Sequence, residues 1–217
     1  MGGALAGLVI LVIGDSQMMG MLSTLQDQLL DAGATVHSYA VCGSTAEDWT
    51  MPSTASCGTL ERQGRTPAVL NMKAGPTWNL SNLIAQDRPN LIVVELGDAM
   101  AGYGGHLELG WVHDQISGLT AKIAASRASC VWVGPPWGED KGSYRKTVAQ
   151  VQGMSQLLSQ SVAPCHYIDS TTLSRPGDWH TRDGSHLEPD GYRRWSVGIV
   201  GAIERLRGQG ALGTVQH

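Results

Sequence analysis

The chain has 217 residues, a length that one domain can fold around its own core. Hydrophobic residues make up 42% and charged residues 16%, a globular balance that excludes extended disorder. The formal net charge is -4, and lysine and arginine are scattered, so no basic stripe is present to bind nucleic acid. We therefore expect a single domain over residues 1–217 that does not bind nucleic acid.

The first apolar run covers residues 4–13. It is too short to span a bilayer, and it lacks the basic residues and small-residue cleavage site of a secretory signal. The run leads directly into Gly14, Asp15 and Ser16. We interpret it as a buried strand and expect no membrane span.

Further apolar runs predict a parallel sheet. Short stretches rich in Val, Ile and Leu predict five buried strands at residues 8–13, 35–40, 91–96, 130–133 and 166–169. Helical spacing of apolar residues predicts helices at residues 18–32, 107–126, 144–161 and 191–207. Alternation of this kind is typical of an α/β fold. We predict a flavodoxin-like three-layer α/β/α sandwich with a five-stranded parallel sheet.

The segment between the second and third predicted strands is longer than a simple connection. Residues 43–90 mix turn residues with tryptophan, methionine and leucine, and only residues 79–85 have a helical pattern. We expect an irregular insertion packed over the site, which in open α/β sheets lies beyond the carboxyl ends of the strands.

The four cysteines leave two interpretations open. Cys42, Cys57, Cys130 and Cys165 form no CxxC pair and have no zinc-finger spacing to histidine. Cys42–Cys57 and Cys130–Cys165 could be disulfides, which would indicate a periplasmic or secreted protein. If the cysteines are instead reduced, buried side chains, the protein is expected in the cytoplasm.

Two motifs carry residues for nucleophilic catalysis. Gly14-Asp15-Ser16 follows the first strand, where a helix start would expose the serine hydroxyl and favour developing negative charge. Taken alone, the tripeptide is a common helix cap. Asp183-Gly184-Ser185-His186 precedes the last helix, and its carboxylate can orient the imidazole as a general base for serine. We therefore predict catalytic roles for Ser16, Asp183 and His186.

In combination and in order, these motifs resemble the SGNH (GDSL-type) hydrolase family. The first block of that family matches Gly14-Asp15-Ser16, its lone glycine falls on Gly43, and its late Asp-x-x-His falls on Asp183 and His186. The resemblance spans nearly the whole chain. It implies an esterase in which an oxyanion is held by the N–H groups of Ser16 and Gly43 and by an asparagine side chain.

The third block departs from the family pattern. Gly97-Asp98-Ala99-Met100 stands where the family has Gly-x-Asn-Asp, so Ala99 occupies the oxyanion-hole position of the asparagine and has no side-chain donor. Loss of one such donor typically costs about 10²- to 10³-fold in rate. The resemblance therefore implies an esterase with a weakened oxyanion hole.

Other candidate residues concern substrate and cofactor. Asp15, beside the serine, and Trp137 and Trp179, in loops expected near the site, are predicted to bind substrate, because aromatic faces suit sugar rings or acyl chains. Ordinary packing is the alternative for the tryptophans. The remaining histidines have no paired ligand spacing, so we expect no metal and no cofactor.

The resulting prediction is a serine ester hydrolase acting through an acyl-enzyme on Ser16. Acetyl or other small acyl esters, including those of carbohydrates, are the substrates that the family resemblance implies. Two alternatives remain open: a non-catalytic or weakly catalytic carbohydrate-binding relative, and an O-acyltransferase that uses the same triad.

Overall fold

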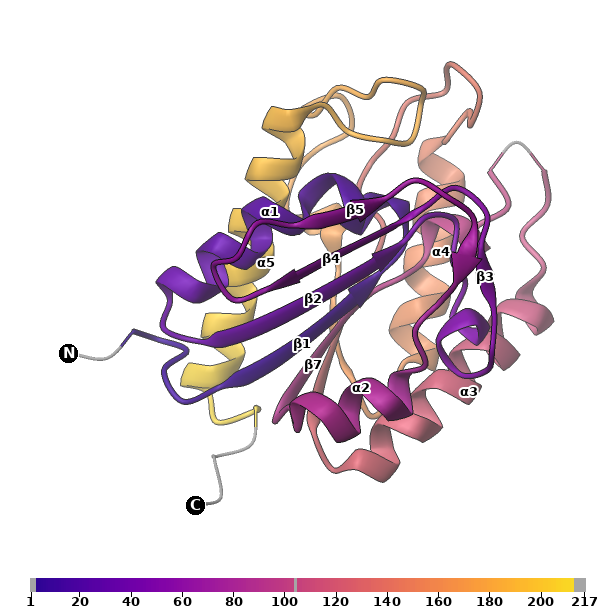
Figure 1. Ribbon diagram of the computed structural model, residues 1–217. Coiled ribbons are helices and arrows are strands. Elements are labelled where there is room, and N and C mark those ends of the chain that lie inside the picture. Colours follow the sequence, from indigo (N-terminus) through magenta and orange to yellow (C-terminus); the bar gives the residue numbers. More distant parts are fainter. Residues whose placement is uncertain (1–2, 104, 213–217) are drawn as a thin grey trace.

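The structure, a computed structural model, describes residues 3–103 and 105–212 (Figure 1). Five parallel strands form its centre, in the spatial order β2-β1-β7-β8-β9. They are β1 (Val9–Gly14), β2 (Thr35–Val41), β7 (Leu91–Glu95), β8 (Ser129–Val133) and β9 (His166–Ile168). Gly14 at the end of β1 lies between Ala40 and Glu95. The loops that follow β1, β2 and β7 therefore leave the sheet at the same edge.

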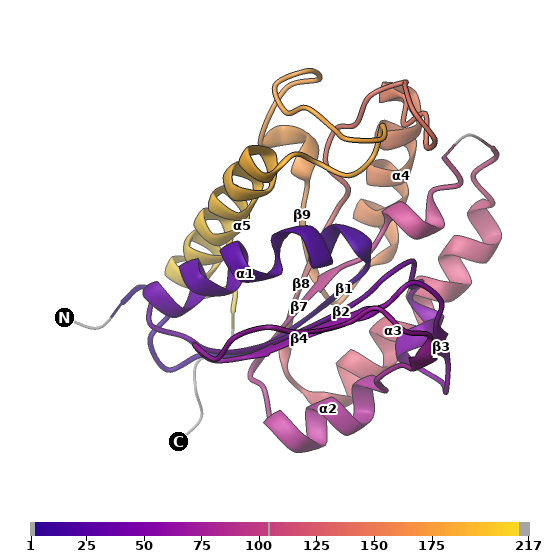
Figure 2. The same ribbon diagram turned by 45° about the horizontal axis from the view of Figure 1, so that its top comes forward.

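Helices cover both faces of this sheet. Helices α1 (Ser16–Asp31) and α5 (Pro189–Gly208) pack on one face, and α2 (Leu80–Asp87), α3 (Leu109–Ser126) and α4 (Val148–Ser161) contribute to the core on the other. Figure 2 shows α1 and α5 on the side of the sheet opposite to α2 and α3. The predicted three-layer α/β/α sandwich is confirmed.

The sheet has seven strands, so the prediction of five was wrong. Strand β4 (Thr59–Gln63) pairs antiparallel with β2, and β5 (Val69–Asn71) pairs antiparallel with β4. A separate ribbon joins β3 (Thr54–Ala55) to β6 (Gly75–Pro76). The insertion predicted to be irregular thus extends one edge of the sheet. Because β4 is only half-buried and contains a single apolar residue, Leu60, it lacks the hydrophobic run that marks a buried strand.

Residues at the N-termini of three helices are typical of helix starts, and in α1 and α4 they form side-chain caps. Helix α1 starts at Ser16, two residues before the predicted start, because Asp15 accepts the N–H of Gln17. Helix α4 starts at Val148 and not at Tyr144, since Thr147 and Gln150 form a capping box. Pro189 stands in the first turn of α5.

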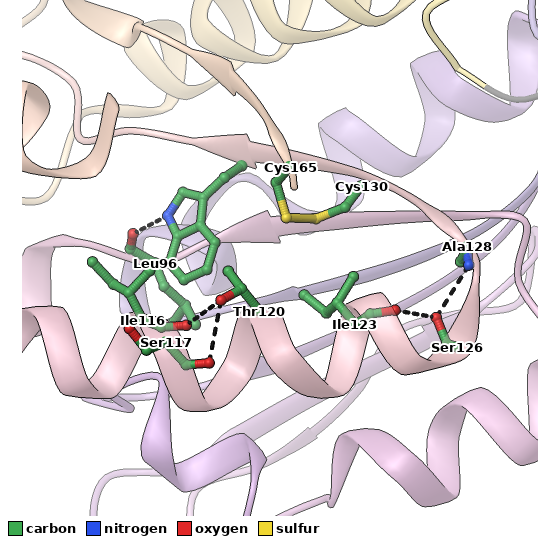
Figure 3. Close-up of a disulfide and its surroundings, with 10 residues drawn as sticks. Leu96, Ile116, Ser117, Thr120, Ile123, Ser126, Ala128, Cys130 and Cys165 are labelled. Atoms are coloured by element: carbon green, nitrogen blue, oxygen red, sulfur yellow. Dashed lines mark hydrogen bonds between the residues drawn. A yellow bond between two sulfur atoms is a disulfide. The ribbon is translucent and has the colours of Figure 1, made fainter. Parts of the chain in front are cut away.

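Both cysteine pairs are bonded: Cys42 to Cys57, and Cys130 to Cys165. The second disulfide is buried on the face of the sheet that α3 covers (Figure 3). Within the described residues, the helices lack the combination of length and apolarity that a membrane span requires.

Candidate active site

A cavity of about 130 Å³ opens at the carboxyl edge of the sheet. The chain segments that form it follow β1, β2, β7 and β8 or precede α5, so residues far apart in sequence meet there. Its lining consists of Ser16, Cys42, Gly43, Cys57, Asp98, Ala99, Tyr103, Tyr144, Ser185 and His186. Four of the five residues predicted for catalysis and the oxyanion hole line this cavity, namely Ser16, Gly43, Ala99 and His186, and the fifth, Asp183, is hydrogen-bonded to His186.

The turn from β1 into α1 places Ser16 in the cavity. Gly14 ends the strand, and a Cβ atom on it would lie 2.5 Å from the Cβ of Met18, so the helix can start this close to the strand only after glycine. Asp15 then caps α1 through the N–H of Gln17 at 2.8 Å. Ser16 is left at the helix N-terminus, where the helix dipole favours negative charge.

Ser16, His186 and Asp183 form a continuous hydrogen-bonded line. The Oγ of Ser16 lies 2.8 Å from Nε2 of His186, and Nδ1 of His186 lies 2.7 Å from Oδ2 of Asp183. A carboxylate can only accept, so Nδ1 carries the hydrogen and the Nε2 of a neutral ring accepts from the serine hydroxyl. This is the tautomer that can take a proton from Ser16.

The Asp183 carboxylate is held in its charged form. Burial raises the pKa of Asp183. The hydrogen bonds from the backbone N–H and side chain of His186 and from the N–H of Ser185 lower it by more, so the net shift is downward. Oδ1 accepts the N–H groups of Ser185 at 3.0 Å and His186 at 2.8 Å. Gly184 allows this tight turn because its φ is +100°.

Two backbone N–H groups are available to an oxyanion. Within the part of the chain that the structure describes, neither Ser16 nor Gly43 donates its N–H to a backbone carbonyl, and both residues line the cavity. Gly43 has a φ of +72°, a conformation that favours glycine. Ala99 also lines the cavity, and its methyl group cannot donate a hydrogen bond.

Asp98 joins the two sides of the site. Its carboxylate accepts a hydrogen bond from the side-chain amide of Gln17, the residue after Ser16. It also accepts one, at 3.0 Å, from the hydroxyl of Ser185, the residue before His186. The fully buried Lys146 neutralises it, with Nζ 2.8 Å from both carboxylate oxygens. The hydroxyl of Tyr103 donates to it as well, at 2.8 Å. The negative charge that would repel an oxyanion is therefore paired.

Two more carboxyl groups are buried beneath the site, Asp15 and Glu95. Burial and the neighbouring Asp98 raise the pKa of Asp15 to about 7, although N–H groups of Gln17 and Ala99 and the charge of Lys146 act in the opposite direction. Burial, and the charges of Asp15 and Asp98, also raise the pKa of Glu95. The cluster thus binds protons at pH values where exposed carboxyl groups have lost them.

Asp15 should make stability fall as pH rises. Between about pH 4 and 7 the folded chain keeps the Asp15 proton that the unfolded chain has lost, so the stabilisation present at low pH disappears as pH approaches 7. We expect a contribution of up to about -1.4 kcal/mol per pH unit to the slope of the unfolding free energy. The unfolding free energy measured with urea at pH 5, 6 and 7 should depend less steeply on pH in Asp15→Asn than in the parent. The amide oxygen of the asparagine can still cap α1. Identical slopes in parent and variant would contradict the raised pKa.

The structure does not bring the residues predicted to bind substrate into the cavity. Asp15 is fully buried and acts as a helix cap. Trp137 is 8% exposed and donates its indole N–H to the carbonyls of Thr171 and Ser174. Trp179 is 7% exposed and belongs to the core between the sheet and α5. For both tryptophans the packing alternative describes the observed position.

Sequence reasoning missed the aromatic residues that do line the cavity. Tyr103 lies in the loop after Ala99, and Tyr144 lies within the helix predicted at residues 144–161 but precedes the Thr147 cap at which α4 begins. Tyr144 is 42% exposed, and its ring meets that of His186 edge-on at 5.2 Å. The Thr147-x-x-Gln150 capping box is the sequence signal that could have placed Tyr144 in a loop.

This fold is shared with solved structures of acylhydrolases and acetylesterases, as the resemblance to SGNH (GDSL-type) hydrolases predicts. A lipase/acylhydrolase from Enterococcus faecalis superposes with a TM-score of 0.62 at 14% identity, over 96% of this chain and 99% of that one. A carbohydrate acetylesterase family member from Sinorhizobium meliloti superposes with a TM-score of 0.63 at 19% identity, over 92% of this chain and 99% of that one. At these identities the likeness concerns the fold.

A sequence relative gives the closer assignment. Protein BcsX from Komagataeibacter xylinus is 40% identical over 217 residues, which cover 95% of this chain and 82% of the relative. The chain therefore belongs to the BcsX family. No protein-family model matches it.

Proposed function

We propose that this chain is a serine ester hydrolase for small acyl esters, with Ser16 as nucleophile, His186 as general base and Asp183 as the residue that orients and charge-stabilises His186. The observation that carries the proposal is the line of hydrogen bonds from Ser16 Oγ through His186 to Asp183, whose serine end lies in a cavity. A base at this distance makes a serine hydroxyl more nucleophilic, and an ionised carboxylate partner orients the base and stabilises its protonated form.

In the proposed reaction His186 Nε2 takes the hydroxyl proton as Ser16 Oγ attacks the ester carbonyl. The N–H groups of Ser16 and Gly43 bind the resulting oxyanion. The tetrahedral intermediate collapses, the leaving alcohol receives the proton from Nε2, and an acyl-enzyme remains on Ser16. Water, deprotonated by the same nitrogen, then releases the acid and restores the serine.

The cavity favours an acetyl or similarly small acyl group. Its volume of about 130 Å³ is well below the roughly 300 Å³ at which pockets for drug-sized ligands begin. The Cys42–Cys57 disulfide and Ala99 give part of its wall an apolar surface. The exposed ring of Tyr144 at its rim could face a sugar as the alcohol part of the ester, and one structural neighbour is a carbohydrate acetylesterase family member.

The two disulfides support an oxidising compartment, periplasmic or extracellular, since cytoplasmic thiol systems keep most cysteines reduced. The same compartment would give the site access to extracellular carbohydrate esters.

The test combines turnover with covalent labelling of the wild-type chain. We expect hydrolysis of p-nitrophenyl acetate above the buffer blank, and a single adduct from a fluorophosphonate, located by peptide mass spectrometry on Ser16. Release of acetate from acetylated xylo-oligosaccharides would support the sugar ester, and transfer of the acetyl group to an added oligosaccharide would favour the acyltransferase alternative. Absence of both turnover and label would refute the proposal and favour a carbohydrate-binding relative.

A further inference from the structure

The Cys42–Cys57 disulfide forms part of the wall of the candidate active site. Both cysteines line the cavity together with Ser16 and His186. Cys42 follows the last residue of β2 and immediately precedes Gly43, while Cys57 belongs to the insertion, two residues before β4. Cys42 also donates its N–H to the carbonyl of Gly58 at 3.0 Å. The backbone just before Gly43 is therefore attached to the insertion both covalently and by a hydrogen bond.

The Sγ of Cys57 also lies close to the space that a side chain at Gly43 would occupy. A Cβ atom on Gly43 would be 3.9 Å from the Sγ of Cys57, which is van der Waals distance. On its other side Gly43 is followed by Ser44, whose N–H donates to Val41 at 3.1 Å and whose hydroxyl accepts the indole N–H of Trp49 at 3.2 Å. Gly43 is solvent-exposed and is held in position by these neighbours and not by bonds of its own N–H.

We propose that Cys42 and Cys57 are positioning residues for the oxyanion-binding N–H of Gly43, so that turnover depends on the bond between them. This inference rests on the proposed function. An oxyanion donor is effective only when it is fixed before the reaction, and a displacement near 1 Å can cost about 10²-fold in rate. Because Ala99 offers no side-chain donor, this chain depends more on its two backbone donors than an enzyme with an asparagine in that place.

The second disulfide provides a matched control within the same molecule. Cys130 and Cys165 are 4% and 8% exposed and are packed among the apolar residues beneath α3, among them Ile116 and Ile123 (Figure 3). Their bond closes a segment with a sequence separation of 35, against 15 for Cys42–Cys57. A longer closed loop restricts the unfolded chain more, so loss of Cys130–Cys165 should reduce stability more. Its loss should leave the Gly43 amide in place.

The experiment compares two double variants, Cys42→Ala/Cys57→Ala and Cys130→Ala/Cys165→Ala, with the parent at a temperature where all are folded. Removal of Cys42–Cys57 should lower kcat for p-nitrophenyl acetate by about tenfold or more and change KM little. Removal of Cys130–Cys165 should lower Tm further but leave kcat near the parent value. Adding Ala99→Asn to the Cys42→Ala/Cys57→Ala variant should reduce its loss of kcat, because an independent donor then shares the oxyanion.

The backbone motion of Gly43, measured by ¹⁵N relaxation, gives a readout that does not require activity. We expect its order parameter to fall in Cys42→Ala/Cys57→Ala and to stay unchanged in the control pair. If Gly43 loses order while the parent shows neither turnover nor labelling of Ser16, the positioning inference stands and the proposed function fails. An unchanged order parameter, or equal losses of kcat in both double variants, would overturn the inference.

Discussion

Ser16→Ala is expected to lower kcat for p-nitrophenyl acetate by at least about 10⁴-fold, because it removes the atom proposed to form the acyl-enzyme. The Oγ of Ser16 is the group that lies 2.8 Å from the His186 base. What activity remains should come from binding and from the oxyanion donors alone, and it should show no covalent intermediate. Rapid-quench mass spectrometry would detect the acetyl adduct on the parent and its absence on the variant.

A serine on the outer surface provides the control for this substitution. Ser159 is exposed on α4, and Ser159→Ala removes the same atom at a place outside the cavity lining. It should keep the parent kcat. If Ser16→Ala retained the parent rate after purification to constant specific activity, Ser16 could not be the nucleophile, and the hydrogen-bonded line to Asp183 would have a structural role only.

Ala99→Asn is expected to raise kcat, by up to about 10²-fold, by supplying a side-chain donor for the oxyanion. Ala99 lines the cavity together with Ser16 and Gly43, so an amide at this position enters the space where the tetrahedral oxygen would develop. The gain should appear in kcat and in kcat/KM together, since the donor acts on the transition state more than on the bound ester. Steady-state kinetics on p-nitrophenyl acetate measures both.

The comparison with Ala99→Leu separates donation from filling of space. Leucine has a bulk comparable to asparagine and no hydrogen to donate, so it should lower kcat or leave it unchanged. The buried Asp98 is already bonded to Lys146, Gln17 and Ser185, which leaves the new amide free to face the cavity. A fall in kcat with both substitutions would mean that Ala99 is required for its small size, and that the two backbone donors suffice.

The Asp98–Lys146 pair explains how this site accommodates an aspartate beside the oxyanion position. Breaking a buried ion pair by removing one partner typically costs about 3–5 kcal/mol, because it leaves a buried charge uncompensated. The partners are 48 residues apart in sequence, one after β7 and the other in the loop after β8. Nothing in the local pattern around either residue indicates the other.

The sequence by itself determined the five parallel strands, the main helices and the placement of Ser16, Asp183 and His186. Each of these depends on information carried within a few neighbouring residues: a continuous apolar run for a buried strand, a period of 3.6 for a helix, or a short motif at a strand or helix end. The carboxyl ends of parallel strands share one edge of the sheet. A parallel sheet therefore predicts that the motifs after β1 and β2 lie close together.

Only the tertiary structure decided which side chains face the cavity. Trp137 and Trp179 stand in loops near the site but turn into the core, whereas Tyr103 and Tyr144 line the cavity. The pairing of β4 with β2, like the Cys42–Cys57 disulfide in the cavity wall beside Gly43, depends on how a long insertion folds back on the sheet. Contacts of this kind follow from strand register and side-chain direction across distant segments, which local periodicity does not encode.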